Sequence, residues 1–309
     1  MIEIKNLTKK IGENIILNDL SFSVKTGEIL GFLGPNGAGK TSTMKIITSF
    51  WMPTSGSVTI DGLDVVEDSL KTRAKIGYLP ETVPLYEDMK VSEYLNFAAK
   101  MRQIAKDKLK ERIAEVAIAC GITNVLQKSI DELSKGYRQR VGLAQAIMGN
   151  PDVLILDEPT TGLDPNQIVE IRELIKKIGK EKTVIFSTHI LSEVSAVCDR
   201  VIIINNGKIA GAGSPAELLK NAKTKELIYA KVQGDKEKVL AILKNISGAV
   251  KVLIKDEEEE NVVGYEIETA DGLDVRASLN RAIINGGFEI LEVSKSKASL
   301  EDVFRELTK

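Results

Sequence analysis

The chain has 309 residues, of which 43% are hydrophobic and 28% are charged, as in an ordinary globular protein. Its length predicts two domains. Lysine and arginine number 42 against 44 aspartates and glutamates, so the net charge of -2 gives no basic character, and we expect no nucleic-acid partner. No apolar run is long enough to span a bilayer, and the first residues lack a signal-peptide pattern.

The N-terminal segment has the pattern of half-buried strands. Apolar and polar residues alternate over Ile2–Ile4, Ser21–Val24 and Ser57–Ile60, and Asp61-Gly62 is typical of a turn. The short apolar run Glu28–Leu33 lies between them and predicts a buried strand. We therefore expect a small antiparallel sheet beside one buried strand.

A glycine-rich loop follows that buried strand. It fits the phosphate-binding pattern Gly-x-x-x-x-Gly-Lys-Ser/Thr at every fixed position, and helical periodicity follows it. The predicted nucleotide-binding residues of this loop are Gly34, Pro35, Asn36, Gly37, Ala38, Gly39, Lys40, Thr41 and Ser42. Strand, glycine-rich turn and helix are the context in which this motif binds phosphate.

The chemistry of the loop follows from this geometry. Glycines allow a tight turn whose backbone N–H groups converge, and the helix N-terminus adds a partial positive charge, so polyphosphate is favoured there. Lys40 reaches the outer phosphates, and the hydroxyl of Thr41 is suited to Mg²⁺. A dinucleotide-binding loop is the nearest alternative, but its glycine spacing differs and it has no use for Lys40.

The middle of the chain has helical periodicity. Apolar residues recur at helical spacing from Val91 to about Cys120, which predicts a helical insertion. Two less regular stretches, Gly77–Glu81 and Leu133–Arg140, bracket it. Neither Cys120 nor Cys198 has metal-ligand or redox spacing, so we interpret both as buried thiols.

Two buried strands further on end in candidate catalytic residues. Val153–Leu156 is followed by Asp157 and Glu158, and Thr183–Thr188 is followed by His189, the only histidine. Carboxyl ends of parallel strands form the active-site edge of doubly wound sheets. We expect Asp157 to bind Mg²⁺ and Glu158 to polarise an attacking water. A solvated strand end and a structural histidine are the simpler alternatives.

The order of these motifs resembles that of the ATP-binding cassette (ABC) ATPases over roughly the first 220 residues. Leu133-Ser134-Lys135-Gly136 looks like the signature sequence of this family, and Thr161–Asp164 matches the loop that crosses its dimer interface. The resemblance implies an α/β phosphate-loop core with an antiparallel β subdomain and a helical subdomain. It also implies hydrolysis of ATP with Mg²⁺.

The resemblance also implies how two copies work together. Two cassettes are expected to pair head to tail on ATP binding, with two nucleotides between them. Ser134 and Gly136 would then contact the γ-phosphate bound to the loop of the other subunit, and Asp164 would lie at the interface. His189 would link the γ-phosphate to Glu158, so Lys40, Glu158 and His189 form the predicted catalytic set.

The chain departs from the family pattern at two positions near the nucleotide. Ile11 stands where many members have an aromatic residue that stacks on adenine. Glu81 stands where a glutamine usually senses Mg²⁺ and the partner domain, and as a carboxylate it is still a candidate ligand of Mg²⁺. Glu81 is accordingly predicted as a nucleotide- and metal-site residue.

Some motifs look like those of a narrower group, the stand-alone ATPases of bacterial and archaeal exporters for gliding motility, sodium efflux and drug resistance. They are Pro80-Glu81, Leu85-Tyr86 and Leu133–Tyr137. The resemblance implies a membrane-spanning partner subunit, with this chain bound peripherally at the cytoplasmic face of the cell membrane. The stretch from Glu81 to Tyr94 is the expected docking surface. Alternatives are an ABC ATPase with a regulatory or nucleic-acid role and a binding module with little turnover.

The sequence changes character after residue 220. Strand-like and helical patterns alternate in the order β-α-β-β-α-β, which is the order of a ferredoxin-like fold, and a last helix covers Leu300–Leu307. The acidic run Asp256–Glu260 is predicted to be a solvated turn between two strands. We therefore predict an ABC ATPase domain over residues 1–220 and an accessory, regulatory domain over 221–309.

Overall fold

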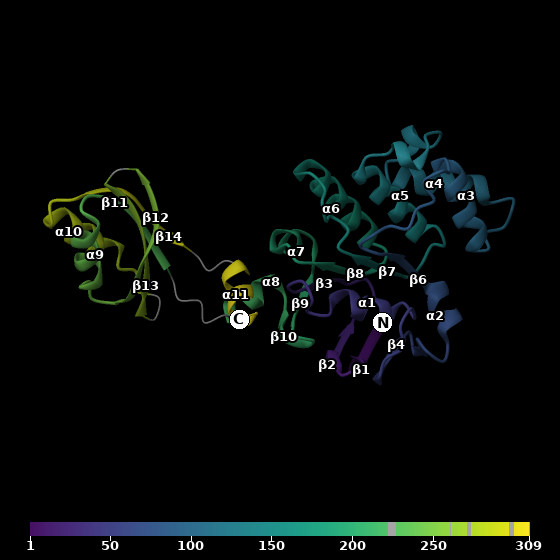
Figure 1. Cartoon of the computed structure of the whole chain (residues 1–309), viewed down its shortest axis with the longest axis horizontal. Helices are drawn as coiled ribbons and strands as arrows, with labels where there is room; N and C mark the ends of the chain where they lie inside the picture. Colours follow the sequence, from purple (N-terminus) through teal and green to yellow (C-terminus); the bar gives the residue numbers. More distant parts are fainter. Residues whose placement is uncertain (222–226, 260, 271–272, 297–299, 309) are drawn as a thin grey trace. The chain divides into compact units, whose positions relative to one another are not determined.

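The computed structural model describes residues 1–221, 227–259, 261–270, 273–296 and 300–308, and the chain forms two compact units (Figure 1). Met1–Ala216, together with the end of the chain from Leu307, forms the first unit, and Glu217–Glu306 forms the second. The division falls inside α8 (Pro215–Asn221), whereas the sequence predicts it after residue 220. None of the described helices is long and apolar enough to cross a membrane.

An antiparallel sheet begins the first unit. Its strands lie in the order β2-β1-β4-β5, from β1 (Ile2–Ile11), β2 (Asn14–Val24), β4 (Ser55–Ile60) and β5 (Leu63–Asp64). Alternate side chains of β1, such as Ile2 and Ile4, are buried, which is why this segment forms a half-buried strand.

A six-stranded sheet forms the centre of the first unit, in the order β10-β9-β3-β8-β7-β6. The strands are β3 (Ile29–Leu33), β6 (Ile76–Leu79), β7 (Val153–Asp157), β8 (Thr183–Thr188), β9 (Arg200–Asn205) and β10 (Lys208–Gly213). All pairs but β9–β10 are parallel, so β3, β6, β7 and β8 end at one edge of the sheet. Every residue of β3, β7 and β8 is buried, as expected for a sheet covered on both faces.

Some helices lie near this sheet, and others form a separate cluster beside it (Figure 1). The helices near the sheet are α1 (Lys40–Ile47), α2 (Ser69–Lys75), α6 (Pro165–Gly179) and α7 (Leu191–Val197), and the cluster consists of α3 (Val91–Met101), α4 (Leu109–Ala119) and α5 (Lys135–Ile147). Short 3-10 turns, Thr123–Val125 and Ile130–Glu132, precede α5. α5 packs closely on β6. A Cβ at Gly77 of β6 would lie only 2.3 Å from the carbonyl oxygen of Ala146 of α5.

The second unit is a sheet covered on one face by two helices (Figure 1). Its elements follow in the order β11 (Leu227–Gln233), α9 (Lys236–Lys244), β12 (Ala249–Glu259), β13 (Val262–Thr269), α10 (Arg276–Asn285) and β14 (Glu289–Ser296). The strands are antiparallel in the order β12-β13-β11-β14, and α11 (Leu300–Leu307) follows them.

The prediction for the acidic run is wrong. The sequence predicts that residues 256–260 form a turn, but β12 continues to Glu259, and Glu257 and Glu259 pair with Val263 and Val262. Pairing with β13 overrides the low strand propensity of acidic residues. Glu260 lies outside the described residues, and the chain turns at Asn261, whose φ is 67°.

Candidate functional site

The glycine-rich loop joins β3 to α1 and is fixed by its glycines. Gly37 and Gly39 have φ values of 79° and 107°, in the left-handed region that glycine adopts readily. A Cβ at Gly34 would lie 2.5 Å from the carbonyl oxygen of Ile204, so only glycine fits this close approach to β9. Ala38 is buried beneath the loop. The loop therefore presents its backbone and the first residues of α1 outward.

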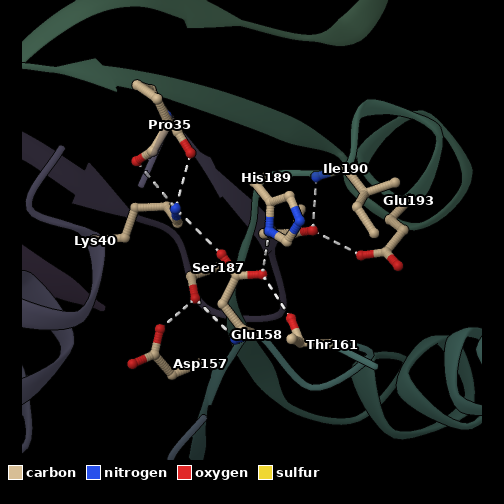
Figure 2. Close-up of polar contacts among 11 residues, drawn as sticks. Pro35, Lys40, Asp157, Glu158, Thr161, Ser187, His189, Ile190 and Glu193 are labelled. Atoms are coloured by element: carbon tan, nitrogen blue, oxygen red, sulfur yellow. Dashed lines mark hydrogen bonds and ion pairs between the residues drawn. The ribbon is translucent and has the colours of Figure 1, made fainter. Parts of the chain in front are cut away.

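Lys40 is buried and held at three points (Figure 2). Its ammonium Nζ donates to the carbonyl oxygens of Gly34 and Pro35 at 2.8 and 3.3 Å. It also forms an ion pair with Glu158, with Nζ 3.1 Å from Oε1. A cation is thus positioned within the loop, next to the carboxylate expected to activate water.

Asp157 is the last residue of β7 and is fully buried. The Ser187 hydroxyl donates to its Oδ1 at 2.5 Å, whereas its Oδ2 is buried without a hydrogen-bond partner among the described residues. Burial raises the pKa of Asp157, the hydroxyls of Ser187 and Thr41 lower it, and the charges of Glu158 and Glu81 raise it further. An unsatisfied buried carboxylate oxygen of this kind is a fitting ligand for a hard cation such as Mg²⁺.

Glu158 has a left-handed backbone, with φ of 50°, which is uncommon for a residue other than glycine. Its N–H donates to the Ser187 carbonyl at 3.2 Å and to the Ser187 hydroxyl at 3.0 Å. Its Oε2 accepts from the Thr161 hydroxyl at 3.1 Å and lies 2.8 Å from His189 Nδ1. Glu158 is therefore bound on every side, with Lys40 at one oxygen and His189 at the other (Figure 2).

His189 follows the end of β8, with 42% of its side chain exposed. The Thr188 hydroxyl before it donates to the buried carboxylate of Glu193 at 2.7 Å and accepts the N–H of Ile190 at 3.0 Å (Figure 2). These contacts fix the backbone on both sides of His189. The imidazole can therefore contact both Glu158 and a ligand from solvent.

Residues of the glycine-rich loop, together with Glu158 and His189, line a hollow of about 520 Å³. The lining residues are Ile11, Ile16, Asn36, Gly37, Gly39, Lys40, Thr41, Ser42, Trp51, Glu81, Glu158, Thr161 and His189. Ile11 is 49% exposed, which places an apolar side chain where the sequence predicts the base. The hollow thus joins an apolar rim to a polar floor of loop backbone, cation and carboxylates.

A second hollow of about 510 Å³ contains the signature residues and shares no lining residue with the first. Ser134, Gly136 and Asp164 line it, together with Gly121, Tyr137, Arg140, Asn166, Gln167 and Glu170. Ser134 caps α5 by accepting the Tyr137 N–H at 3.4 Å, and Asp164 caps α6 by accepting the Gln167 N–H at 2.9 Å. Two helix N-termini therefore open on one hollow, an arrangement that favours an anion.

The structure brings the predicted phosphate-binding and catalytic residues together, and it places the predicted signature residues at the other hollow. Loop residues 36, 37 and 39–42 meet Glu81, Glu158 and His189 at one hollow, with Asp157 buried beside them, whereas Gly34, Pro35 and Ala38 lie off its lining. Sequence reasoning placed Thr161 only in the interface loop, and it missed Ile16 and Trp51, which line this hollow, and Ser187, which contacts Asp157. Trp51, the only tryptophan, packs under Lys45 with Nζ 4.7 Å from its ring centre. Thr161 is brought to the site by the turn directly after Glu158, whereas no spacing signal links Ser187 or Trp51 to the loop, because the strand register and the turn after α1 bring them there.

Comparison with known proteins identifies the family. Residues 17–161 match the family model described as ABC transporter. An uncharacterized ABC transporter ATP-binding protein of Bacillus subtilis is 36% identical over 310 residues, which cover 100% of this chain and 96% of that protein. The bacitracin transport ATP-binding protein of Bacillus licheniformis is 34% identical over 316 residues, covering 99% of this chain and 97% of that protein.

A solved structure is also similar. A bacterial ABC transporter cassette, determined as a dimer, aligns with a TM-score of 0.63 and 28% identity over 69% of this chain and 98% of its own. The chain belongs to the ABC transporter ATP-binding proteins. It is the ATP-hydrolysing subunit of a transporter, and the relatives favour this class over an ATPase unconnected with transport.

Proposed function

We propose that this chain hydrolyses ATP as a head-to-tail homodimer with two nucleotides between its subunits, and drives export through a separate membrane-spanning subunit. The separation of the two hollows carries this proposal. The loop and the signature residues line different hollows of one chain, and they share no lining residue. A second copy would bring Ser134, Gly136 and Asp164 to the nucleotide held by the loop, and the similar cassette is a dimer.

The residues present fit a Mg²⁺ ion. The free buried oxygen of Asp157 and the hydroxyl of Thr41 would hold it, and Glu81 lines the same hollow as Thr41 and raises the pKa of Asp157 by its charge. When bound, the ion would neutralise charge on the phosphates. The loop backbone, with Asn36, Gly37, Gly39 and Ser42 on the lining, would hold the phosphates, and Lys40 would contact the outer ones.

The chemistry of the proposed step is mainly one of position and charge. Glu158 orients the water and accepts its proton, while Thr161 and His189 hold the carboxylate at 3.1 and 2.8 Å. Lys40 stabilises charge on the transferring phosphoryl group, and the exposed edge of His189 contacts the γ-phosphate. Ser134 and the N-terminus of α5 from the other copy complete the charge neutralisation.

ATPase rate against protein concentration tests this proposal. With Mg²⁺ present, the rate per subunit should rise with concentration as dimers form, and Lys40→Ala should abolish it. Lys176→Ala, an exposed lysine paired with Glu173 on α6, is the matched control and should hydrolyse ATP normally. A concentration-independent rate in the wild type would contradict the dimer, and normal turnover in Lys40→Ala would contradict the loop assignment.

The proposed docking surface for the membrane subunit lies over residues 81–94. Tyr86 is 54% exposed and packs edge-on against Tyr94 and Phe97, with ring centres 6.1 and 5.6 Å away. Exposed aromatic clusters favour protein contacts. Tyr86→Asp should weaken binding to the membrane subunit in vesicles, whereas Ile118→Asp, an exposed apolar residue on α4, should not. Equal binding by both variants would contradict this surface, whereas no binding by the wild-type chain would contradict the peripheral location at the cytoplasmic membrane face.

The second unit is proposed to be a ferredoxin-like accessory domain. Its element order β-α-β-β-α-β and its strand order β12-β13-β11-β14 support this fold. Its function would be to regulate or strengthen dimerisation, because none of its described residues lines either hollow. A chain truncated before residue 223 should dimerise more weakly, and unchanged dimerisation and ATPase activity would contradict this function.

A further inference from the structure

Ser187 lies between the two acids of the site and is fully buried on β8. Parallel pairing places it directly beside Asp157, whose side chain it contacts. Its hydroxyl oxygen lies 2.5 Å from Asp157 Oδ1 and 3.0 Å from the backbone nitrogen of Glu158 (Figure 2). One hydroxyl therefore contacts both the expected metal ligand and the expected base.

The direction of both hydrogen bonds is determined by chemistry. A backbone N–H can only donate, so the Ser187 oxygen accepts from Glu158. The single hydroxyl proton then goes to Asp157 Oδ1. This bond holds one carboxylate oxygen of Asp157 and leaves the other, buried and without a partner among the described residues, in a fixed direction.

The same residue supports the unusual backbone of Glu158. Both the carbonyl and the hydroxyl of Ser187 accept the Glu158 N–H, at 3.2 and 3.0 Å. Glu158 has φ of 50°, a conformation that persists only where the surroundings hold it. The direction in which the Glu158 carboxylate leaves the main chain therefore depends in part on the Ser187 hydroxyl.

We propose that Ser187 is a positioning residue whose one hydroxyl aligns Asp157 for the divalent cation and Glu158 for the water. Cation binding and water activation then depend on the same side chain. The inference rests on the proposed function, since it presupposes that Asp157 binds Mg²⁺ and that Glu158 is the base.

The chain supplies a matched control on the same strand. Thr183, at the other end of β8, is also buried, and its hydroxyl accepts the N–H of Gly27 at 3.0 Å. Among the described residues it makes no hydrogen bond to the site, so Thr183→Ala removes a buried hydroxyl and a backbone contact without touching either acid. Ser187→Ala removes the proposed alignment.

The experiment measures Mg²⁺ binding apart from turnover. The purified full chain is titrated with Mg²⁺ at saturating ATP, and the rise in melting temperature gives the Mg²⁺ concentration for half-maximal effect. Calorimetry with ATP in EDTA measures nucleotide binding without the ion. Steady-state kinetics then give kcat and KM for each variant.

For Ser187→Ala we expect the half-maximal Mg²⁺ concentration to rise and kcat to fall, each by about 10–100-fold, as for other groups that orient metal ligands. ATP affinity in EDTA should stay within about twofold of wild type, because Lys40 and the loop are intact. Thr183→Ala should match wild type in Mg²⁺ requirement, and Ser187→Thr, which retains a hydroxyl, should recover most of the effect.

Two outcomes would overturn the inference. A wild-type Mg²⁺ requirement and kcat in Ser187→Ala would do so, as would equal changes in Thr183→Ala. If Ser187→Ala does not fold, Ser187→Cys replaces it, because a thiol keeps the shape but donates weakly, and an unchanged Mg²⁺ requirement there is equally negative. Normal turnover in Lys40→Ala would instead show that the proposed function itself has failed.

Discussion

The two units of this chain bury different kinds of side chain. Among the described residues, the first unit buries Lys40, Asp157, Glu158 and Glu193, all of them ionisable. In the described part of the second unit, the buried core contains no charged side chain, and its polar groups are Thr269 and the Tyr265 hydroxyl, which donates to the Lys236 carbonyl at 3.1 Å. Buried charge is costly unless it is paired or binds a ligand, so it occurs where chemistry requires it. The comparison shows that, among the described residues, the buried charges lie in the first unit, whereas the core of the second unit consists mainly of packed apolar side chains behind a hydrogen-bonded sheet.

The largest expected effect comes from changing the charge of one residue in the first unit. Glu158→Gln keeps the side-chain shape but cannot accept a proton, so ATP turnover should fall by about 10²–10⁴-fold while ATP affinity is retained. Phosphate release and calorimetry measure the two quantities. Glu173→Gln, an exposed acid of α6, is the control and should turn over normally. Normal turnover in Glu158→Gln would contradict the assignment of the base.

A core substitution in the second unit should lower stability and leave the nucleotide site unaffected. Ile283 of α10 is 0% exposed, and its neighbour Ile284 is 65% exposed. Ile283→Ala should lower the free energy of unfolding of this unit by about 2–5 kcal/mol, and Ile284→Ala should change it by less than about 0.5 kcal/mol. Denaturant unfolding followed by circular dichroism measures both. ATP affinity should be unchanged in both variants, and its loss in a folded Ile283→Ala protein would break the contrast between the units.

A smaller effect should show that the buried charge of Asp157 lowers the stability of the first unit when no cation is bound. Burial raises the pKa of Asp157, so the folded state binds its proton more tightly than the unfolded chain does, and stability is lost as pH rises from below the ordinary carboxyl pKa through the raised one. At neutral pH in EDTA, Asp157→Asn should therefore raise the melting temperature by a few degrees.

The pH dependence of that gain is the discriminating measurement. The difference in melting temperature between Asp157→Asn and wild type should shrink as the pH falls through the raised pKa of Asp157 towards the ordinary carboxyl pKa, below which both side chains are neutral. Asp152→Asn, an exposed acid paired with Lys75 at 3.3 Å, should give no comparable gain. A lower melting temperature for Asp157→Asn than for wild type at neutral pH would show that the buried charge does not destabilise the fold.

Much of the fold was accessible from periodicity and turn chemistry. Continuous apolar runs predicted β7 and β8, and helical spacing predicted α3 and α4. The acidic run failed because strand pairing is a long-range effect: nothing local in residues 256–259 signals that Val262 and Val263 lie opposite. Local patterns therefore predict elements well but not how far a paired strand continues.

The same distinction between local patterns and long-range contacts applies to the residues of the site. Lys40, Thr41 and Asp157 could be predicted because each stands at a fixed place in a loop or at a strand end. Ser187 could not be, because its role depends on the register that sets it beside Asp157. Likewise, the separation of Ser134 and Asp164 from the loop is a property of three dimensions, which the sequence indicates only through family resemblance.

The left-handed backbone at Glu158 has a consequence for how this position can evolve. A residue other than glycine in this region costs of order 1–3 kcal/mol, but glycine would also remove the partner of the buried Lys40 ammonium, which costs about 3–5 kcal/mol. Such a chain would lose the carboxylate yet keep Lys40 and the loop. Its buried ammonium would then lack its ion-pair partner, so even a lineage that has ceased to need turnover is expected to retain a partner for Lys40, and an acid at this position is not by itself a record of hydrolysis.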